Sequence, residues 1–429
     1  MKPPGVCNVN RKSYAAPDDP ALPREDCCPR YAHPRTGQVR RDIGKVIMSR
    51  IRLAVLIAAF AFGAICTSAA PAHPPIILAY VFPQNAALQP GQIDAKSLDR
   101  INYAFANIKD GEMVTGFAQD EANYAYLAAL HKENPSLKVL ASVGGWLWSG
   151  GFSDVSLTAH SRRRFIDSVM KFLAAHRLDG LDIDWEYPGM AGSTQSFRPE
   201  DGHNFTLLLQ ELRDRFDRKS RQTGRRLYLT IAAGSSDEYL AHTEMRKVQH
   251  YVDTVNLMAY DYYEPGSGPI TGHHAPLFAN PADPAKSSAD ASVQAFERAG
   301  VPAAKILLGV PFYGHMWGQV PAAENGLYQR GVQIPNAYAP YRLIVTTMLE
   351  HGYTRYWDPV SSVPYLYNPA QQIFVSYEDP QSLAAKCDYV LSHKLGGVMF
   401  WEYSGDSAGT LLGVLNQSLH AKETRKAVK

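Results

Sequence analysis

Short runs of apolar residues recur along most of the chain and predict strands. Eight such runs are rich in β-forming residues and cover residues 76–82, 100–107, 137–145, 179–186, 227–234, 252–261, 305–314 and 396–402. Between most of them the apolar residues recur every three to four positions, a spacing that predicts helices, as in 161–176 and 203–216. Eight strands that alternate with helices indicate an α/β protein with a parallel sheet, and eight strands close naturally into a (β/α)8 TIM barrel.

The fourth run, residues 179–186, differs from the others because acidic and apolar residues alternate in it. In an extended strand this spacing places Asp182, Asp184 and Glu186 on one face, roughly 6–7 Å apart. The intervening residues are predicted to face an apolar layer and are Leu181, Ile183 and Trp185. Three acids on one face repel each other and are costly to desolvate, so the pattern predicts a functional use.

Alternating acids often mark the exposed face of an edge strand, and a calcium-binding loop is a second interpretation. Calcium loops run through turns rich in Asn, Asp and Gly, whereas Leu, Ile and Trp separate these acids. We therefore interpret residues 179–186 as a strand buried on one side, with its acids facing a barrel interior or a cleft. A middle Asp that holds a proton could then poise Glu186 as an acid. Asp179 has the opposite strand parity and is predicted to be structural.

The motif D-G-x-D-x-D-x-E, followed here by Tyr187 and Pro188, resembles the signature of glycoside hydrolase family 18, the chitinases. Other segments resemble the family in the same order: Tyr80, residues 142–146 (SVGGW), 258–261 (MAYD), 271–277 (TGHHAPL), 309–314 (GVPFYG) and 396–401 (GGVMFW). The resemblance covers about residues 75–410. The family commonly has Arg after the P-F-Y-G segment, where this chain has His315, so a contact with sugar or a neighbouring acid is expected to differ there.

The resemblance implies a catalytic set of four residues. Glu186 would protonate the leaving oxygen, while Asp184 would orient the acetamido group of the sugar, which attacks the anomeric carbon. Asp182 would exchange a proton with Asp184, and Tyr260 would hydrogen-bond the acetamido oxygen. The substrate-binding residues that it implies are Tyr80, Phe105, Gly145, Trp146, Tyr187, Met258, Asp261, Tyr313 and Trp401. Such a reaction needs no metal and no cofactor.

The implied activity is that of a chitinase acting within chitin or chitooligosaccharide chains, at β-1,4 bonds between N-acetylglucosamine units. Two alternatives stay open. One is an endo-β-N-acetylglucosaminidase acting on glycoprotein or peptidoglycan, and the other is a chitin-binding lectin on the same barrel. Such lectins usually lose the acid equivalent to Glu186, which this chain keeps.

About 80 residues separate the seventh and eighth predicted strands, more than a helical connection needs. The segment 316–377 is predicted to be a small α+β insertion. Its aromatic residues would form a core of their own, one wall of a substrate cleft, or both. They are Trp317, Tyr328, Tyr338, Tyr341, Tyr356, Trp357, Tyr365 and Tyr367.

The N-terminal part of the chain reads as a leader. Residues 1–47 hold much Pro and Arg and are predicted to be an upstream extension or a mis-called start, with an unusually long leader as the alternative. Residues 48–72 combine a basic start, a short apolar run and Ala70-Pro71-Ala72, which predicts a signal peptide and a secreted protein, extracellular or periplasmic. The catalytic barrel is assigned to 73–417 and a basic tail to 418–429.

The leader also accounts for the formal net charge of +2. Residues 73–429 carry 32 basic and 36 acidic residues, a net charge of −4, so we expect no nucleic-acid partner. After signal cleavage we also expect no membrane association, and a monomer. Only Cys387 remains in that part of the chain, so we expect no internal disulfide and a packing role for this cysteine.

Overall fold

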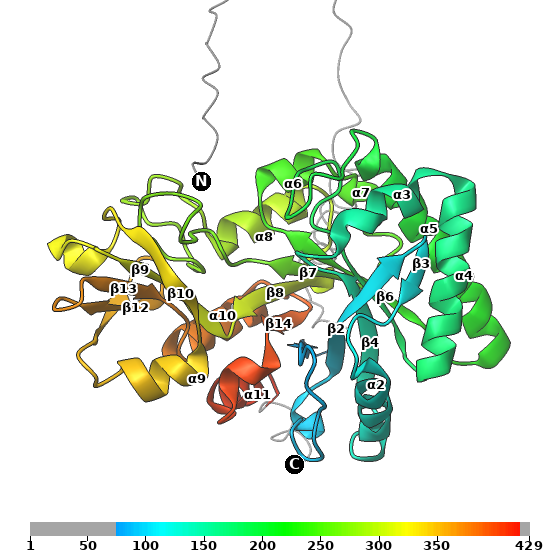
Figure 1. Cartoon of the computed structure of the whole chain (residues 1–429), viewed down its shortest axis with the longest axis horizontal. Helices are drawn as coiled ribbons and strands as arrows, with labels where there is room; N and C mark the ends of the chain where they lie inside the picture. The colour runs from blue at the N-terminus through cyan, green and yellow to red at the C-terminus, as the bar shows by residue number, and fades with distance from the viewer. Residues whose placement is uncertain (1–73, 421–429) are drawn as a thin grey trace, which may run out of the picture. The chain divides into compact units, whose positions relative to one another are not determined.

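The computed structural model describes residues 74–420 (Figure 1). The predicted upstream extension and signal peptide, and residues 421–429 of the predicted tail, lie outside the described residues. Eight parallel strands form a closed barrel in the order β1-β14-β8-β7-β6-β5-β4-β2, with β1 paired to β2. Their bounds are β1 Ile76–Val81, β2 Arg100–Lys109, β4 Lys138–Gly144, β5 Gly180–Asp184, β6 Tyr228–Gly234, β7 Thr254–Met258, β8 Ile306–Pro311 and β14 Gly397–Trp401. The predicted (β/α)8 barrel is confirmed.

Helices follow most of the barrel strands along the chain. They are α2 Asp120–Ala129, α3 Phe152–Leu157, α4 Ala159–His176, α5 Asp201–Thr223, α6 Asp237–Ala241, α7 Met245–Val248, α8 Ala289–Arg298, α10 Pro380–Ser392 and α11 Thr410–Leu419. Helix α4 begins where Thr158 and Ser161 form a reciprocal capping box, and it ends at Arg177 in a left-handed conformation. A short strand, β3 (Glu112–Val114), pairs antiparallel with β2.

Apolar side chains pack in two layers, one outside the barrel sheet and one inside it. The outer layer, between strands and helices, contains Leu181, Ile183 and Trp185 of the acidic run, as the alternation predicts. Trp185 stacks on Phe152 at a ring separation of 5.2 Å. The smaller inner layer contains Leu78, Tyr80, Ala104, Phe105, Leu307 and Met399. The acids of β5 therefore share the barrel interior with an apolar cluster.

The chain leaves the barrel after β8 and forms a second, five-stranded antiparallel sheet before it returns in α10. The strands, yellow to orange in Figure 1, are β9 Tyr313–Gly318, β10 Val332–Pro340, β11 Thr354–Asp358, β12 Val363–Asn368 and β13 Ile373–Ser376. A short helix, α9 (Tyr341–Leu343), follows β10. The apolar run 305–314, predicted as one strand, is thus divided between two sheets. The insertion lies between the seventh and eighth barrel strands, as predicted.

Within residues 74–420, no helix combines the length and apolar character needed to cross a membrane. Cys387 is fully buried in α10 and makes no disulfide, in agreement with its predicted packing role.

A buried lysine of α10 forms an ion pair just before that helix and also contacts the loop before α8. Lys386 pairs with Glu378 and also donates a hydrogen bond to the Ala275 carbonyl at 2.7 Å. Both charged side chains are 1% exposed or less. Burial raises the pKa of Glu378 and lowers the pKa of Lys386, and their mutual attraction opposes both shifts. Each charge is therefore tolerated in the core only because the other is present.

We predict that Lys386→Met lowers the free energy of unfolding by about 3–5 kcal/mol, because it leaves the Glu378 carboxylate buried without a cation. Chemical denaturation followed by fluorescence measures this change. The double variant Glu378→Leu/Lys386→Met removes both charges and should lose much less. A single variant within about 1 kcal/mol of the wild type would contradict the assignment.

Candidate active site

The C-terminal ends of the barrel strands surround a cavity of about 980 Å³. Most predicted site residues line it: Tyr80, Phe105, Trp146, Asp184, Glu186, Tyr187, Met258, Tyr260, Asp261, Tyr313 and Trp401. Asp182 and Gly145 are the two predicted site residues that do not. Chemistry at the C-terminal face is the general arrangement of this barrel type.

Asp182 lies deeper than the cavity and is completely buried. Its carboxyl group has four hydrogen-bonding partners at 2.5–3.0 Å, namely the hydroxyls of Tyr80, Ser142 and Thr230 and the amide of Asn256. Burial raises its pKa, and the hydroxyl hydrogen bonds oppose that rise. The partners come from strands β1, β4, β6 and β7, so Asp182 connects opposite sides of the barrel.

Asp184 and Glu186 follow Asp182 toward the cavity. Asp184 is the last residue of β5, and its Oδ1 has no hydrogen-bond partner among the described residues. Burial, and then the charges of Glu186 and Asp182, raise the pKa of Asp184 well above its usual value. Burial also raises the pKa of Glu186 to about 7, against an opposing contribution from Tyr187. The three acids therefore retain at least one proton near neutral pH.

Asp182, Asp184 and Glu186 form an acid row, and two glycines bring the end of β4 against it. Gly144 has a φ of 106°, and a Cβ there would lie 2.2 Å from the Asp184 carbonyl oxygen. Gly145 has a φ of 75°, and a Cβ there would lie 2.6 Å from the Phe105 ring. The Gly145 amide donates to the Asp184 carbonyl at 2.8 Å. Gly145 thus packs beside Phe105, whereas its neighbours Gly144 and Trp146 reach the cavity.

Aromatic rings form one side of the cavity around Trp401. Its indole stacks on Phe105 at 5.5 Å with an interplanar angle of 18°, and lies 5.7 Å from Tyr80 and 5.4 Å from Phe82. Met258 packs against the same cluster. The arrangement presents flat apolar surface next to the acid row.

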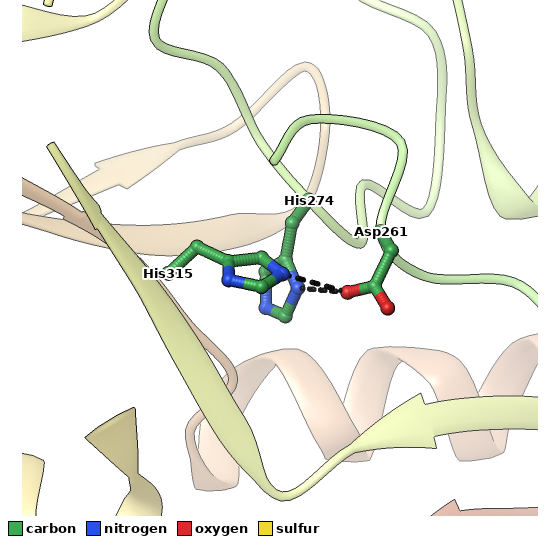
Figure 2. Close-up of side chains that lie close together, drawn as sticks. All are labelled: Asp261, His274 and His315. Carbon is green, nitrogen blue, oxygen red and sulfur yellow. Dashed lines mark hydrogen bonds and ion pairs between the residues drawn. The ribbon is translucent and has the colours of Figure 1, made fainter. Parts of the chain in front are cut away.

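A polar group on another wall is centred on Asp261. One oxygen, Oδ1, accepts a hydrogen bond from the Tyr313 hydroxyl at 2.6 Å and lies 2.8 Å from Nε2 of His315 and 3.4 Å from Nδ1 of His274. Figure 2 shows both imidazole rings directed at this oxygen. Burial alone would raise the pKa of Asp261, but the hydrogen bonds with His274 and His315 hold it well below its usual value. Burial lowers the pKa of His274 to about 4.

The family model described as glycosyl hydrolases family 18 matches residues 77–406. The chain belongs to this family. It is 41% identical over 330 residues to Chitinase A1 of Niallia circulans, which covers 73% of this chain and 47% of that protein. The chain therefore spans about half the length of that relative.

Two solved structures resemble the chain over most of its length. A family 18 N-acetylglucosaminidase from Paenibacillus barengoltzii has a TM-score of 0.74 at 39% identity, covering 80% of this chain and 100% of that one. A cell-surface-expressed multi-modular chitinase from Paenibacillus sp. str. FPU-7 has a TM-score of 0.76 at 36% identity, covering 81% of this chain and 33% of that one.

The family 18 insertion has a core of its own and also contributes to the cavity wall. Its core contains Trp317, Tyr365, Tyr367 and Phe374. Of the eight aromatic residues singled out in its sequence, Tyr338 alone lines the cavity. Tyr338 stacks on Tyr313 at 4.7 Å, and Tyr313 and His315 of β9 line the same wall. Some of these aromatic residues therefore form the core of the insertion, and Tyr338 forms part of the cavity wall, so each interpretation applies to different residues.

The sequence pattern missed several residues of this family 18 site. Thr230 and Asn256, which bind Asp182, are polar residues within mainly apolar strands, and that exception was a usable signal. His274 stands within the T-G-H-H-A-P-L segment, but nothing in that pattern links it to Asp261. Other cavity residues that the pattern missed include Phe82, Phe117, Trp148, Tyr262 and Glu264.

Asp179 stands at the opposite end of β5 and does not line the cavity. Its carboxylate accepts hydrogen bonds from the Val139 amide at 2.8 Å and from Arg225 at 2.6 Å. Asp179 therefore connects the start of β5 to β4 and to the segment before β6.

Proposed function

We propose that this family 18 chain is a chitinase that hydrolyses β-1,4 bonds between N-acetylglucosamine units, with the acetamido group of the substrate as the nucleophile. The observation that carries the proposal is the graded acid row. Asp182 is buried and hydrogen-bonded, Asp184 has a strongly raised pKa, and Glu186 faces the cavity with a pKa of about 7.

In the proposed reaction Glu186 gives its proton to the oxygen of the leaving sugar as the bond from that oxygen to the anomeric carbon breaks. The acetamido oxygen forms a new bond to the same carbon and yields a cyclic oxazolinium ion. Asp184 orients the acetamido group and, after passing a proton toward Asp182, faces the cation as a carboxylate. Water then opens the ring, with Glu186 as the base. Family 18 is one of the families that depart from the usual two-carboxylate scheme in this way.

Binding in this proposal uses the aromatic and polar walls separately. Trp401, backed by Phe105 and Tyr80, offers a flat face to the apolar side of the sugar ring at the cleavage site. Tyr260 lines the cavity beside the acid row and would hydrogen-bond the acetamido oxygen, while Asp261 would contact a sugar hydroxyl.

A second candidate is an N-acetylglucosaminidase, which removes single sugars. The likeness to the Paenibacillus barengoltzii enzyme, which covers all of that chain at 39% identity, favours it. A lectin function without hydrolysis has less support, because Glu186 is present and its pKa suits a proton donor. Hydrolysis of glycoprotein or peptidoglycan would use the same acetylated sugar, so only a comparison of substrates distinguishes it from hydrolysis of chitin.

Product analysis tests the proposed function. We expect chitin and chitopentaose to give mainly oligomeric products whose first-formed anomer is β, because the anomeric carbon is inverted twice. Proton NMR and chromatography of the first products measure both. N-acetylglucosamine as the only product would favour the N-acetylglucosaminidase. Cleavage of N-glycoprotein or peptidoglycan without cleavage of chitin would show that one of these is the substrate instead. An α-anomer, or efficient cleavage with glucosamine at the reacting position, would contradict substrate assistance.

The raised pKa of Glu186 predicts the alkaline limit of activity. Burial is the main cause, and the charges of Asp261 and Glu264 add to it. Because the proton donor must be protonated, kcat should fall as pH rises through about 7. Steady-state kinetics between pH 4 and pH 10 measure this fall, which is the alkaline limb of the pH profile. Constant turnover to pH 9 would contradict the assignment of Glu186 as the proton donor.

Two variants test whether the alkaline limb arises from Glu186 or from another carboxylate of the cavity. Glu186→Gln keeps the shape but has no proton to give, so turnover should fall at least about 100-fold and the limb near neutral pH should disappear. Asp237→Asn removes an exposed carboxylate from the rim of the same cavity and should keep both turnover and limb.

We also propose that the protein is secreted and that its mature chain begins at His73. The support is the basic, apolar and small-residue succession of residues 48–72. Expression from Met48 should release active protein into the medium or periplasm, and mass spectrometry should find His73 at its N-terminus. Exported protein that still contains Cys7 would contradict this proposal.

A further inference from the structure

Asp261, His274 and His315 bring three atoms of metal-binding type together, although they come from separate segments. Asp261 follows β7, His274 lies in the loop before α8, and His315 belongs to β9. Their closest carboxylate oxygen and ring nitrogens all lie within 4.8 Å of one another. The separations from Asp261 Oδ1 are 2.8 Å to His315 Nε2 and 3.4 Å to His274 Nδ1 (Figure 2).

We propose that these three residues form a binding site for a divalent transition-metal ion of the zinc type in the wall of the cavity. Two imidazoles and one carboxylate are a donor set that Zn²⁺ uses, whereas Mg²⁺ and Ca²⁺ prefer oxygen atoms alone. In a tetrahedral zinc site with bonds of about 2.0–2.1 Å, neighbouring donor atoms lie about 3.3–3.4 Å apart. The separation between His274 and Asp261 already matches, and that between His315 and Asp261 needs to open by about 0.5 Å.

The surroundings support such a site. The His274 side chain is fully buried and that of His315 is 10% exposed, so the two rings are held in place. Asp261 is 33% exposed and lines the cavity, which gives an ion a way in. The Tyr313 hydroxyl holds the Asp261 carboxylate from outside the donor set, as partners of metal ligands commonly do.

A fourth donor is also at hand. Glu264 Oε1 lies 3.8 Å from His315 Nε2, close enough for a side-chain rotation to bring it to an ion. Water could fill the same position. The proposed ion plays no part in the hydrolysis scheme. Its effect would be to occupy the Asp261 carboxylate, which the proposed function assigns to substrate, and so to inhibit. That consequence rests on the proposed function, whereas binding of the metal does not.

Titration of the full chain with Zn²⁺ alone, by calorimetry, tests the site. The cysteines and other histidines of the chain can also bind zinc, so the comparison between variants decides. His315→Arg keeps a donor against Asp261 but has no lone pair for a metal, and Asp261→Asn replaces the carboxylate by a weak ligand. Each should remove one equivalent of binding, or weaken it at least about tenfold. His203→Arg, which alters an exposed histidine of α5, should leave this binding unchanged.

Three further measurements complete the test. Anomalous diffraction at the zinc edge should place an ion among the three side chains, and thermal unfolding without zinc should show that each variant is folded. Zinc should inhibit chitin hydrolysis by the wild type, EDTA should restore it, and His315→Arg should be less sensitive. Equal zinc binding by the wild type and both variants would overturn the proposal. If binding differs as expected but chitin is not cleaved, the proposed function fails and the metal site stands.

Discussion

The structure depends on keeping three carboxyl groups in a row where little water reaches them, a placement that costs free energy unless each group is compensated. The compensation differs along the row. Asp182 has four hydrogen-bonding partners, Asp184 favours its protonated form, and Glu186 opens onto the cavity. Identical chemical groups two residues apart therefore have different protonation behaviour, because each lies at a different depth.

The same constraint links the fold to the site. The groups that bind Asp182 belong to strands β1, β4, β6 and β7, which lie far apart in the sequence and meet only in a closed barrel. The hydrogen bonds continue below Asp182, since Asn256 accepts from Thr254, and Thr254 accepts from the buried guanidinium of Arg100. A barrel with another register would leave the acids without these partners, so the polar interior favours this register over others.

Sequence periodicity predicted the features that depend on the alternation of side chains, and it did not predict those that depend on where strands end. It placed Leu181, Ile183 and Trp185 in the apolar layer and the acids on the other face. It could not show that the run 305–314 divides between two sheets, because both parts are apolar. Nor could it separate Gly144, which lines the cavity, from Gly145, which packs against Phe105, since the difference lies in one backbone turn. Thr230 and Asn256, which bind Asp182, and His274, which lies beside Asp261, were missed because they become neighbours of these acids only in three dimensions.

The insertion influences the acid row electrostatically as well as by lining the cavity. His274, and His315 of β9, hold Asp261 in its charged form, because hydrogen bonds to a carboxylate favour its ionised state, and the Tyr313 hydroxyl of β9 donates a further hydrogen bond. That charge is in turn one of the contributions that raise the pKa of Glu186. One cavity thus holds a carboxyl group with a lowered pKa, Asp261, beside one with a raised pKa, Glu186, and acid catalysis by a carboxyl group requires such a separation of pKa values. Because His315 and Tyr313 belong to the second sheet, the protonation of Glu186 on the barrel depends partly on a segment outside the barrel.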